Sequence, residues 1–169
     1  MTEFSRPPLG VGWDRFYGWH DQFMRMERWL ERLLRSHSNF HLNDQEGWHE
    51  FWDTAFAFFQ NAYHLKDWIA LEHPGLKNTI EQFVADNPHL RYCADICNGT
   101  KHREVTKRHH IPSHLAGIRE YTPNEPTRQR LLILGPDGPK PVIPLAIACV
   151  DAWRVFTQRI PSSGRPPVV

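Results

Sequence analysis

The sequence lacks an excess of charge of either sign. Twenty Lys and Arg residues stand against 19 Asp and Glu, a net charge of +1 over 169 residues, and 40% of the residues are hydrophobic. These proportions exclude a disordered tail and a globally cationic nucleic-acid coat. Apolar runs are also short, far below the roughly 20 residues that a membrane span needs. We therefore expect a cytoplasmic protein with no membrane partner.

Several chemical signatures are missing as well. The chain has three cysteines and no C-x-x-C pair, which favours reduced thiols over a disulfide framework. It has no Gly-rich phosphate loop, no G-x-S-x-G motif and no alternation of strands and helices. Nucleotide-binding α/β enzymes and α/β-hydrolases are set aside on these grounds, and we expect no cofactor.

Apolar residues recur every three or four positions in most of the remaining chain, which predicts amphipathic helices. A chain of this length is room for one domain of ordinary size. We expect four main helices over residues 13–34, 46–71, 76–87 and 88–111, in the order of an up-and-down bundle. The second is apolar over more than half its circumference, so it should be central in the bundle or covered by a partner chain.

The second half of the chain carries turn signals. Residues 113–130 are polar and contain two prolines, which indicates an exposed loop. The segment Gly135–Pro139 separates two β-prone stretches and predicts a small hairpin near 131–143, followed by a last helix over 144–159. The fold class is thus all-α, with one domain over 11–160, a small hairpin, a C-terminal fifth helix and flexible ends at 1–10 and 161–169.

Two helical segments carry polar groups that an apolar helix does not need. His64 and Asp67, three residues apart on the second helix, can meet on one face. Asp95, Asn98 and His102 form one stripe along the fourth helix. Either set is a solvated edge, a buried polar network, a dimer seam or a working site, because a histidine with a carboxylate and an amide nearby is equipped for proton transfer near neutral pH.

A local concentration of positive charge follows the stripe. Such a patch can track a phosphate backbone, although a solvated helix end with cations near its C-terminus has the same composition. The candidate RNA-binding residues are Lys101, Arg103, Lys107, Arg108, His109 and His110.

The stripe and the preceding segment Tyr63–Trp68 resemble the HEPN superfamily over roughly residues 12–110. The resemblance rests on a helical bundle whose fourth helix displays Asn98-x-x-x-His102. Members are typically dimers, and many are metal-independent ribonucleases of prokaryotic defence and toxin systems. Their histidine would activate the ribose 2′-hydroxyl, and an arginine before the Asn would hold the phosphate. Cys97 occupies that arginine position in this chain.

The resemblance therefore implies a divergent ribonuclease or an RNA-binding derivative. His102 would be the general base, Asn98 its orienter and Asp95 a supporting partner, while Lys101 and Arg103 would replace the missing arginine. His64 and Asp67 would support this site or belong to a dimer seam. The implied partners are a second copy of the chain, RNA, and a cognate antitoxin or defence protein.

Other interpretations remain open at this stage. A non-catalytic dimerisation or interaction module would use the same polar groups as a structural network. The closely spaced His109, His110 and His114 fit no standard zinc spacing, so no metal site is expected. Cys97 and His102, more than a turn apart, would make a poor Cys/His pair unless another chain supplied the base.

Overall fold

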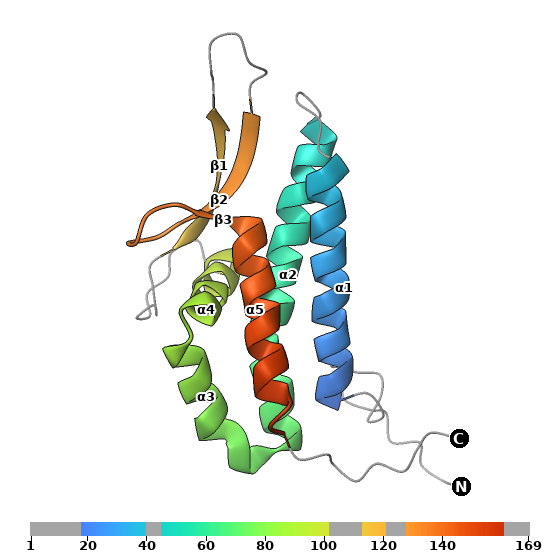
Figure 1. Ribbon diagram of the computed structural model, residues 1–169, viewed down its shortest axis with the longest axis vertical. Coiled ribbons are helices and arrows are strands. Elements are labelled where there is room, and N and C mark those ends of the chain that lie inside the picture. Colours follow the sequence, from blue (N-terminus) through green and yellow to red (C-terminus); the bar gives the residue numbers. More distant parts are fainter. Residues whose placement is uncertain (1–17, 40–44, 102–112, 121–127, 161–169) are drawn as a thin grey trace, which may run out of the picture.

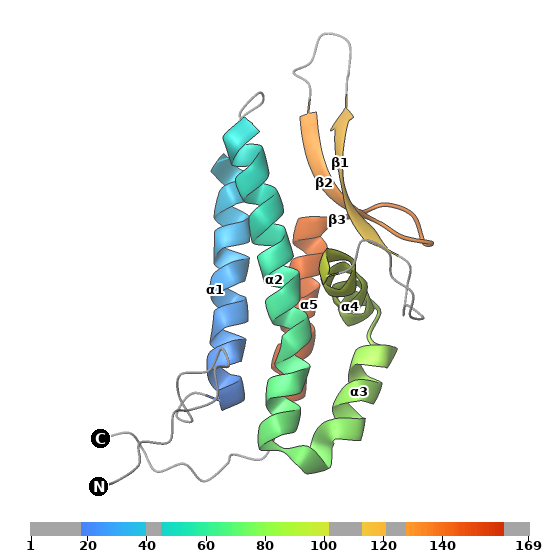
Figure 2. The same ribbon diagram turned by 180° about the vertical axis from the view of Figure 1, so that it is seen from behind.

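Two long antiparallel helices form one side of the molecule. The computed structural model describes residues 18–39, 45–101, 113–120 and 128–160. Helices α1 (Gly18–Asn39) and α2 (Gln45–Glu72) lie side by side (Figures 1 and 2). Two polar contacts show that the helices are antiparallel, because the start of α1 meets the later part of α2 and the end of α1 meets its earlier part. The Gln22 amide donates to the Asn61 carbonyl, and the Ser36 and Thr54 hydroxyls lie 2.9 Å apart.

The core lies along α2. Its buried residues recur at intervals of three or four and so form one stripe along the helix. They are Phe51, Thr54, Ala55, Phe58, Phe59, Ala62, Leu65 and Ile69. This stripe packs against the other helices, so the expected central position of the second helix is confirmed within a single chain.

The chain turns after α2 and forms two shorter helices. A 3₁₀ turn, η1 (Pro74–Leu76), leads into α3 (Lys77–Asp86), and α4 (Pro88–Lys101) follows. Asn87 separates α3 from α4 in an extended conformation, as expected for a residue before proline. Its side-chain oxygen accepts hydrogen bonds from the backbone N–H groups of His89 and Leu90, which caps α4. Helix α4 is seen nearly end-on in Figure 1, so it crosses the long helices.

A three-stranded antiparallel sheet lies beyond α4. Its strands β1 (His114–Glu120), β2 (Arg128–Leu134) and β3 (Lys140–Pro141) pair in sequence order. The prediction of an exposed loop over 113–130 was therefore wrong for residues 114–120 and 128–130. The pairing with β2 makes β1 a strand, whereas the prediction paired the 131–134 stretch only with the stretch that follows it.

Strand β1 passes close to the beginning of α2. A Cβ atom at Gly117 would overlap the indole ring of Trp48. Glycine at this position therefore allows the strand to approach the helix.

The last helix, α5 (Val142–Thr157), begins directly after β3. The predicted hairpin exists, but Val142 and Ile143 belong to the helix and not to its second strand. Helix α5 packs beside α2, and the Trp153 indole N–H donates to the Ala62 carbonyl at 2.9 Å. The predicted all-α bundle with a small hairpin and a fifth helix is confirmed.

Some expectations fall outside the described residues. These are the flexible ends at 1–10 and 161–169, the start of the first helix before residue 18, and the continuation of the fourth helix over 102–111. In the parts of the chain that are described, no helix has the length and apolarity to cross a membrane.

Candidate functional site

A histidine and a carboxylate meet on the edge of α2, beside its buried stripe. Their spacing of three residues places both side chains on one face, and Nδ1 of His64 lies 3.1 Å from Oδ2 of Asp67. The two side chains are 37% and 54% exposed. An ionised carboxylate only accepts hydrogen bonds, so Nδ1 carries the proton and Nε2 of a neutral imidazole is left as an acceptor.

The accepting nitrogen points to a thiol on α4. The Cys97 sulfur lies 3.6 Å from Nε2 of His64, and the cysteine is fully buried. Cys97, His64 and Asp67 thus form a thiol–imidazole–carboxylate series that joins α4 to α2. The sequence suggested that a base for Cys97 would have to come from another chain, whereas the structure provides one from the same chain.

A lysine holds the far side of the carboxylate. Lys66 Nζ donates to Asp67 Oδ1 at 2.8 Å and to Glu81 Oε1, on α3, at 3.0 Å. Burial by itself would lower the pKa of Lys66, but these hydrogen bonds raise the pKa above its ordinary value. Lys66 therefore stays charged and links α2 to α3.

The same contacts keep the carboxylate ionised. Burial by itself would raise the pKa of Asp67, but the hydrogen bonds from His64 and Lys66 outweigh it and lower the pKa below its ordinary value. Burial raises the pKa of the neighbouring Tyr63, whose ring centroid lies 5.0 Å from Lys66 Nζ. At neutral pH, Asp67 is a fixed negative charge behind the His64 ring.

The predicted stripe on α4 is only partly within the described residues. Asp95 is 2% exposed and accepts a hydrogen bond from the Ser113 hydroxyl at 3.4 Å, so it connects α4 to the start of β1. Asn98 is half-buried. The backbone of Lys101 ends α4, and nothing further is described of its side chain.

The rest of the predicted site follows α4 in the chain. The residues in question are His102, Arg103, Lys107, Arg108, His109 and His110, and they lie outside the described residues. Their roles therefore remain predictions from the sequence. Within the described ranges, no group of three or more His, Cys, Asp or Glu side chains is arranged to hold a metal ion.

The other two cysteines have different surroundings. Cys93 on α4 and Cys149 on α5 are fully buried, with their sulfur atoms 3.3 Å apart and both thiols directed at the His89 carbonyl. Burial, together with the contact to Cys149, raises the pKa of the Cys93 thiol well above its ordinary value. The Cys93 thiol is thus a protonated part of the core, whereas Cys97 faces an imidazole.

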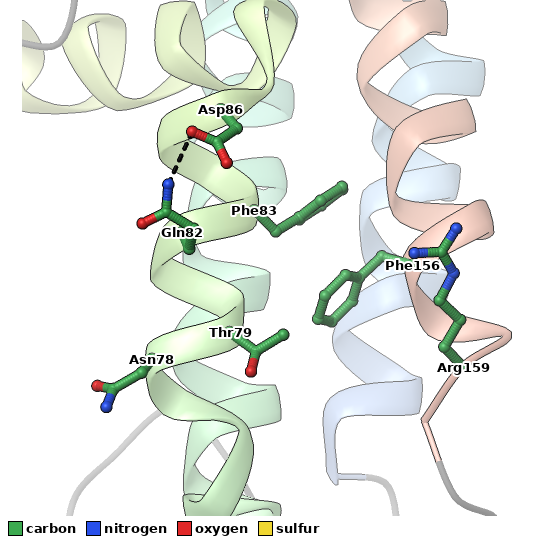
Figure 3. Close-up of a pocket in the computed structure, with 7 residues that line it drawn as sticks. All are labelled: Asn78, Thr79, Gln82, Phe83, Asp86, Phe156 and Arg159. Atoms are coloured by element: carbon green, nitrogen blue, oxygen red, sulfur yellow. Dashed lines mark hydrogen bonds between the residues drawn. The ribbon is translucent and has the colours of Figure 1, made fainter.

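A separate depression lies between α3 and α5 (Figure 3). The rings of Phe83 and Phe156 stack there with centroids 4.5 Å apart, and Gln82 donates to Asp86 at 2.8 Å. The described residues that line this depression include no histidine or cysteine. The series on α2 and α4 is therefore the stronger candidate for chemistry.

Sequence reasoning identified two of the three groups in that series. His64 and Asp67 are local neighbours, so helical spacing alone suggested their contact. Cys97 lies 33 residues from His64, and only the crossing of α4 over α2 brings them together. The hydrogen bond from Lys66 to Glu81 was not predictable either, since it depends on how α3 packs against α2.

Comparison with known proteins identifies no relative of this chain. No protein-family model matches the chain, and neither the curated proteins nor the solved structures contain a significant match. The function is therefore argued from the residues themselves.

Proposed function

We propose that this protein acts on RNA in the manner of the HEPN-like proteins of prokaryotic defence and toxin systems. It would be a divergent metal-independent ribonuclease or an RNA-binding derivative. The observation that supports the proposal is the position of the His64–Asp67 pair. It lies against Cys97, which occupies the family's arginine position and directly precedes Asn98 on α4.

The proposed chemistry is proton transfer on a ribose. His102 takes the proton of the 2′-hydroxyl, Asn98 orients the imidazole, and the freed oxygen attacks the adjacent phosphate. A bond from the 2′-oxygen to phosphorus forms, the bond from phosphorus to the 5′-oxygen breaks, and the leaving 5′-oxygen takes a proton from water. Lys101 and Arg103 replace the missing arginine as charged donors to the phosphate oxygens. Lys107, Arg108, His109 and His110 extend the contact along the RNA backbone.

Polar contacts between the elements would hold this site in place. Asp95 connects the start of β1 to α4, and Lys66 and Asp67 hold the α2 edge on which His64 lies. In the proposal a second copy of the chain packs on α4, so that two such sites share one positively charged cleft. A cognate antitoxin or defence protein would bind the same face.

A second candidate function is a non-catalytic interaction module. The burial of Asp95 favours it, because a carboxylate with 2% exposure is better suited to fixing helix position than to meeting a substrate. In that case the polar contacts among α2, α3 and α4 serve to specify one packing of the helices.

The test uses the full-length protein, structured RNA substrates and excess EDTA, because the proposed cleavage needs no metal. His102→Ala should abolish cleavage and leave the melting temperature unchanged if the protein is a ribonuclease. His49→Ala, an exposed histidine on α2, is the matched control. A lower melting temperature for His102→Ala, with no cleavage by the wild type, favours the interaction module.

RNA binding is measured separately. If the protein is a binding-only derivative, its affinity should fall steeply with salt, and Lys101→Ala with Arg103→Ala should reduce that salt dependence. Wild-type protein that neither cleaves RNA nor binds it in a salt-dependent way would refute the proposal.

A further inference from the structure

The three cysteines of this chain differ in what their sulfur atoms face. Cys93 and Cys149 face each other and a backbone carbonyl, while Cys97 faces the Nε2 atom of His64 at 3.6 Å. The other ring nitrogen of His64 is held by Asp67 at 3.1 Å. Of the three thiols, Cys97 is the one whose neighbour is a base with a fixed orientation.

This arrangement allows a proton transfer that the other thiols lack. The Cys97 thiol can pass its proton to Nε2 of His64, which gives a thiolate beside an imidazolium. Asp67 stabilises the imidazolium, because its negative charge lies at the opposite ring nitrogen. Lys66 holds the carboxylate by its second oxygen, so the ring and the acid keep their relative position.

The burial of the sulfur decides which reactants can reach it. Cys97 is fully buried, and the His64 ring in contact with it is partly exposed. A sulfur atom buried to this degree excludes peptides and polynucleotides as reactants and leaves molecules of a few atoms.

We propose that Cys97 is a reactive thiol, activated by His64 and Asp67, whose substrates are small hydroperoxides. The thiolate attacks one peroxide oxygen, so that an S–O bond forms and the O–O bond breaks. The sulfur is oxidised by two electrons to sulfenic acid, and the peroxide is reduced. The departing alkoxide, or hydroxide when the substrate is hydrogen peroxide, takes the proton from the imidazolium and leaves as an alcohol or as water.

The chemistry of this site needs no nucleic acid and no residue beyond position 97, although both proposals use the contact of His64 and Asp67 with Cys97. Its product would be a polar sulfenic acid at the contact between α2 and α4. It is also distinct from the Cys93 and Cys149 pair, which lies on the side of α4 that packs against α5.

The experiment treats the reduced full-length protein with hydrogen peroxide in the presence of dimedone, which traps sulfenic acids. Mass spectrometry of peptides then gives the labelling rate of each cysteine. Cys97 should be labelled at least about tenfold faster than Cys93 or Cys149, a bound set below the roughly hundredfold or more that a positioned base usually contributes. Equal rates at Cys97 and Cys93 would overturn the proposal.

Two variants test the base without removing bulk from the site. His64→Gln and Asp67→Asn should each slow Cys97 labelling, the former by about tenfold or more. The matched controls His49→Gln and Asp53→Asn, both exposed on α2, should leave the rate unchanged. If His64→Gln accelerates labelling, the ring merely covers the sulfur; if it has no effect, the ring is not the base. Either result refutes the proposal.

A further measurement tests whether Cys97 reacts only when the whole protein unfolds. The labelling rate of Cys97 is measured at urea concentrations well below the unfolding transition. A rate that stays constant under these conditions supports reaction of the folded protein. A rate that rises in proportion to the unfolded fraction would overturn the proposal, because any buried thiol reacts in that way. If His64→Gln does not fold, Asp67→Asn alone decides the role of the imidazole.

Discussion

The indole N–H of Trp153 donates to the main-chain carbonyl of Ala62 at 2.9 Å, which joins α5 to α2. Both residues are fully buried. Ala62 lies two residues before His64, so this bond fixes the part of α2 that carries the candidate site. The position of the His64 ring thus depends on a residue 89 positions further along the chain.

Trp153→Phe should reduce the free energy of unfolding by about 1–3 kcal/mol, because it removes this hydrogen bond and leaves unfilled volume in the core. The measurement is urea denaturation followed by circular dichroism. Trp68→Phe, at a half-buried tryptophan of α2, is the matched control. A loss no larger than that of the control would show that the bond to Ala62 contributes nothing measurable.

The hydroxyls of Ser36 and Thr54 form a second buried contact, between α1 and α2, at 2.9 Å. Removing one hydroxyl deprives the other of a partner, so we expect a coupling of about 0.5–1.5 kcal/mol between Ser36→Ala and Thr54→Ala. A double-mutant cycle measures it. A control cycle that pairs Thr54→Ala with Ser38→Ala, at an exposed serine of α1, should give a coupling near zero.

Glu72, at the end of α2, accepts a hydrogen bond from the backbone N–H of Trp19 at 2.6 Å. This places a carboxylate at the N-terminus of α1, where the helix dipole and the unpaired N–H groups favour negative charge. Glu72→Gln should therefore cost about 0.3–1 kcal/mol in unfolding free energy. The exposed Glu50→Gln on α2 should cost less, and equal effects would argue against the dipole contribution.

The Asp67 carboxylate should make a small, pH-dependent contribution to stability. Its pKa in the folded protein lies below the ordinary value of 3.8, so its contribution is present above that pH and is lost as the pH falls through the folded pKa. Because the side chain is 54% exposed, we expect only a few tenths of a kcal/mol.

The measurement is the stability difference between wild type and Asp67→Asn at several pH values. The difference should shrink as the pH falls below about 4, where the carboxylate becomes protonated. The exposed Asp53→Asn provides the baseline. A difference that does not shrink below about pH 4 would mean that the hydrogen bonds from His64 and Lys66 do not favour the ionised form.

Features encoded by neighbouring residues were predictable from the sequence. The buried stripe of α2 follows from its spacing, the break at Asn87 from the proline after it, and the contact of His64 with Asp67 from one helical turn. Features that need distant segments were not predictable. Strand β1 depends on pairing with β2, Gly117 on the approach of Trp48, and the position of Cys97 on the crossing of α4 over α2.

The direct passage from β3 into α5 leaves no linker between the sheet and that helix. The sheet therefore has no hinge at this end, and its direction in space is tied to the axis of α5. Strand β2 contains seven residues and is about 24 Å long, so a tilt of about 10° in the helix would displace the far end of the strand by roughly 4 Å. Small rotations of one helix would thus cause their largest displacement at the Arg128 end of β2.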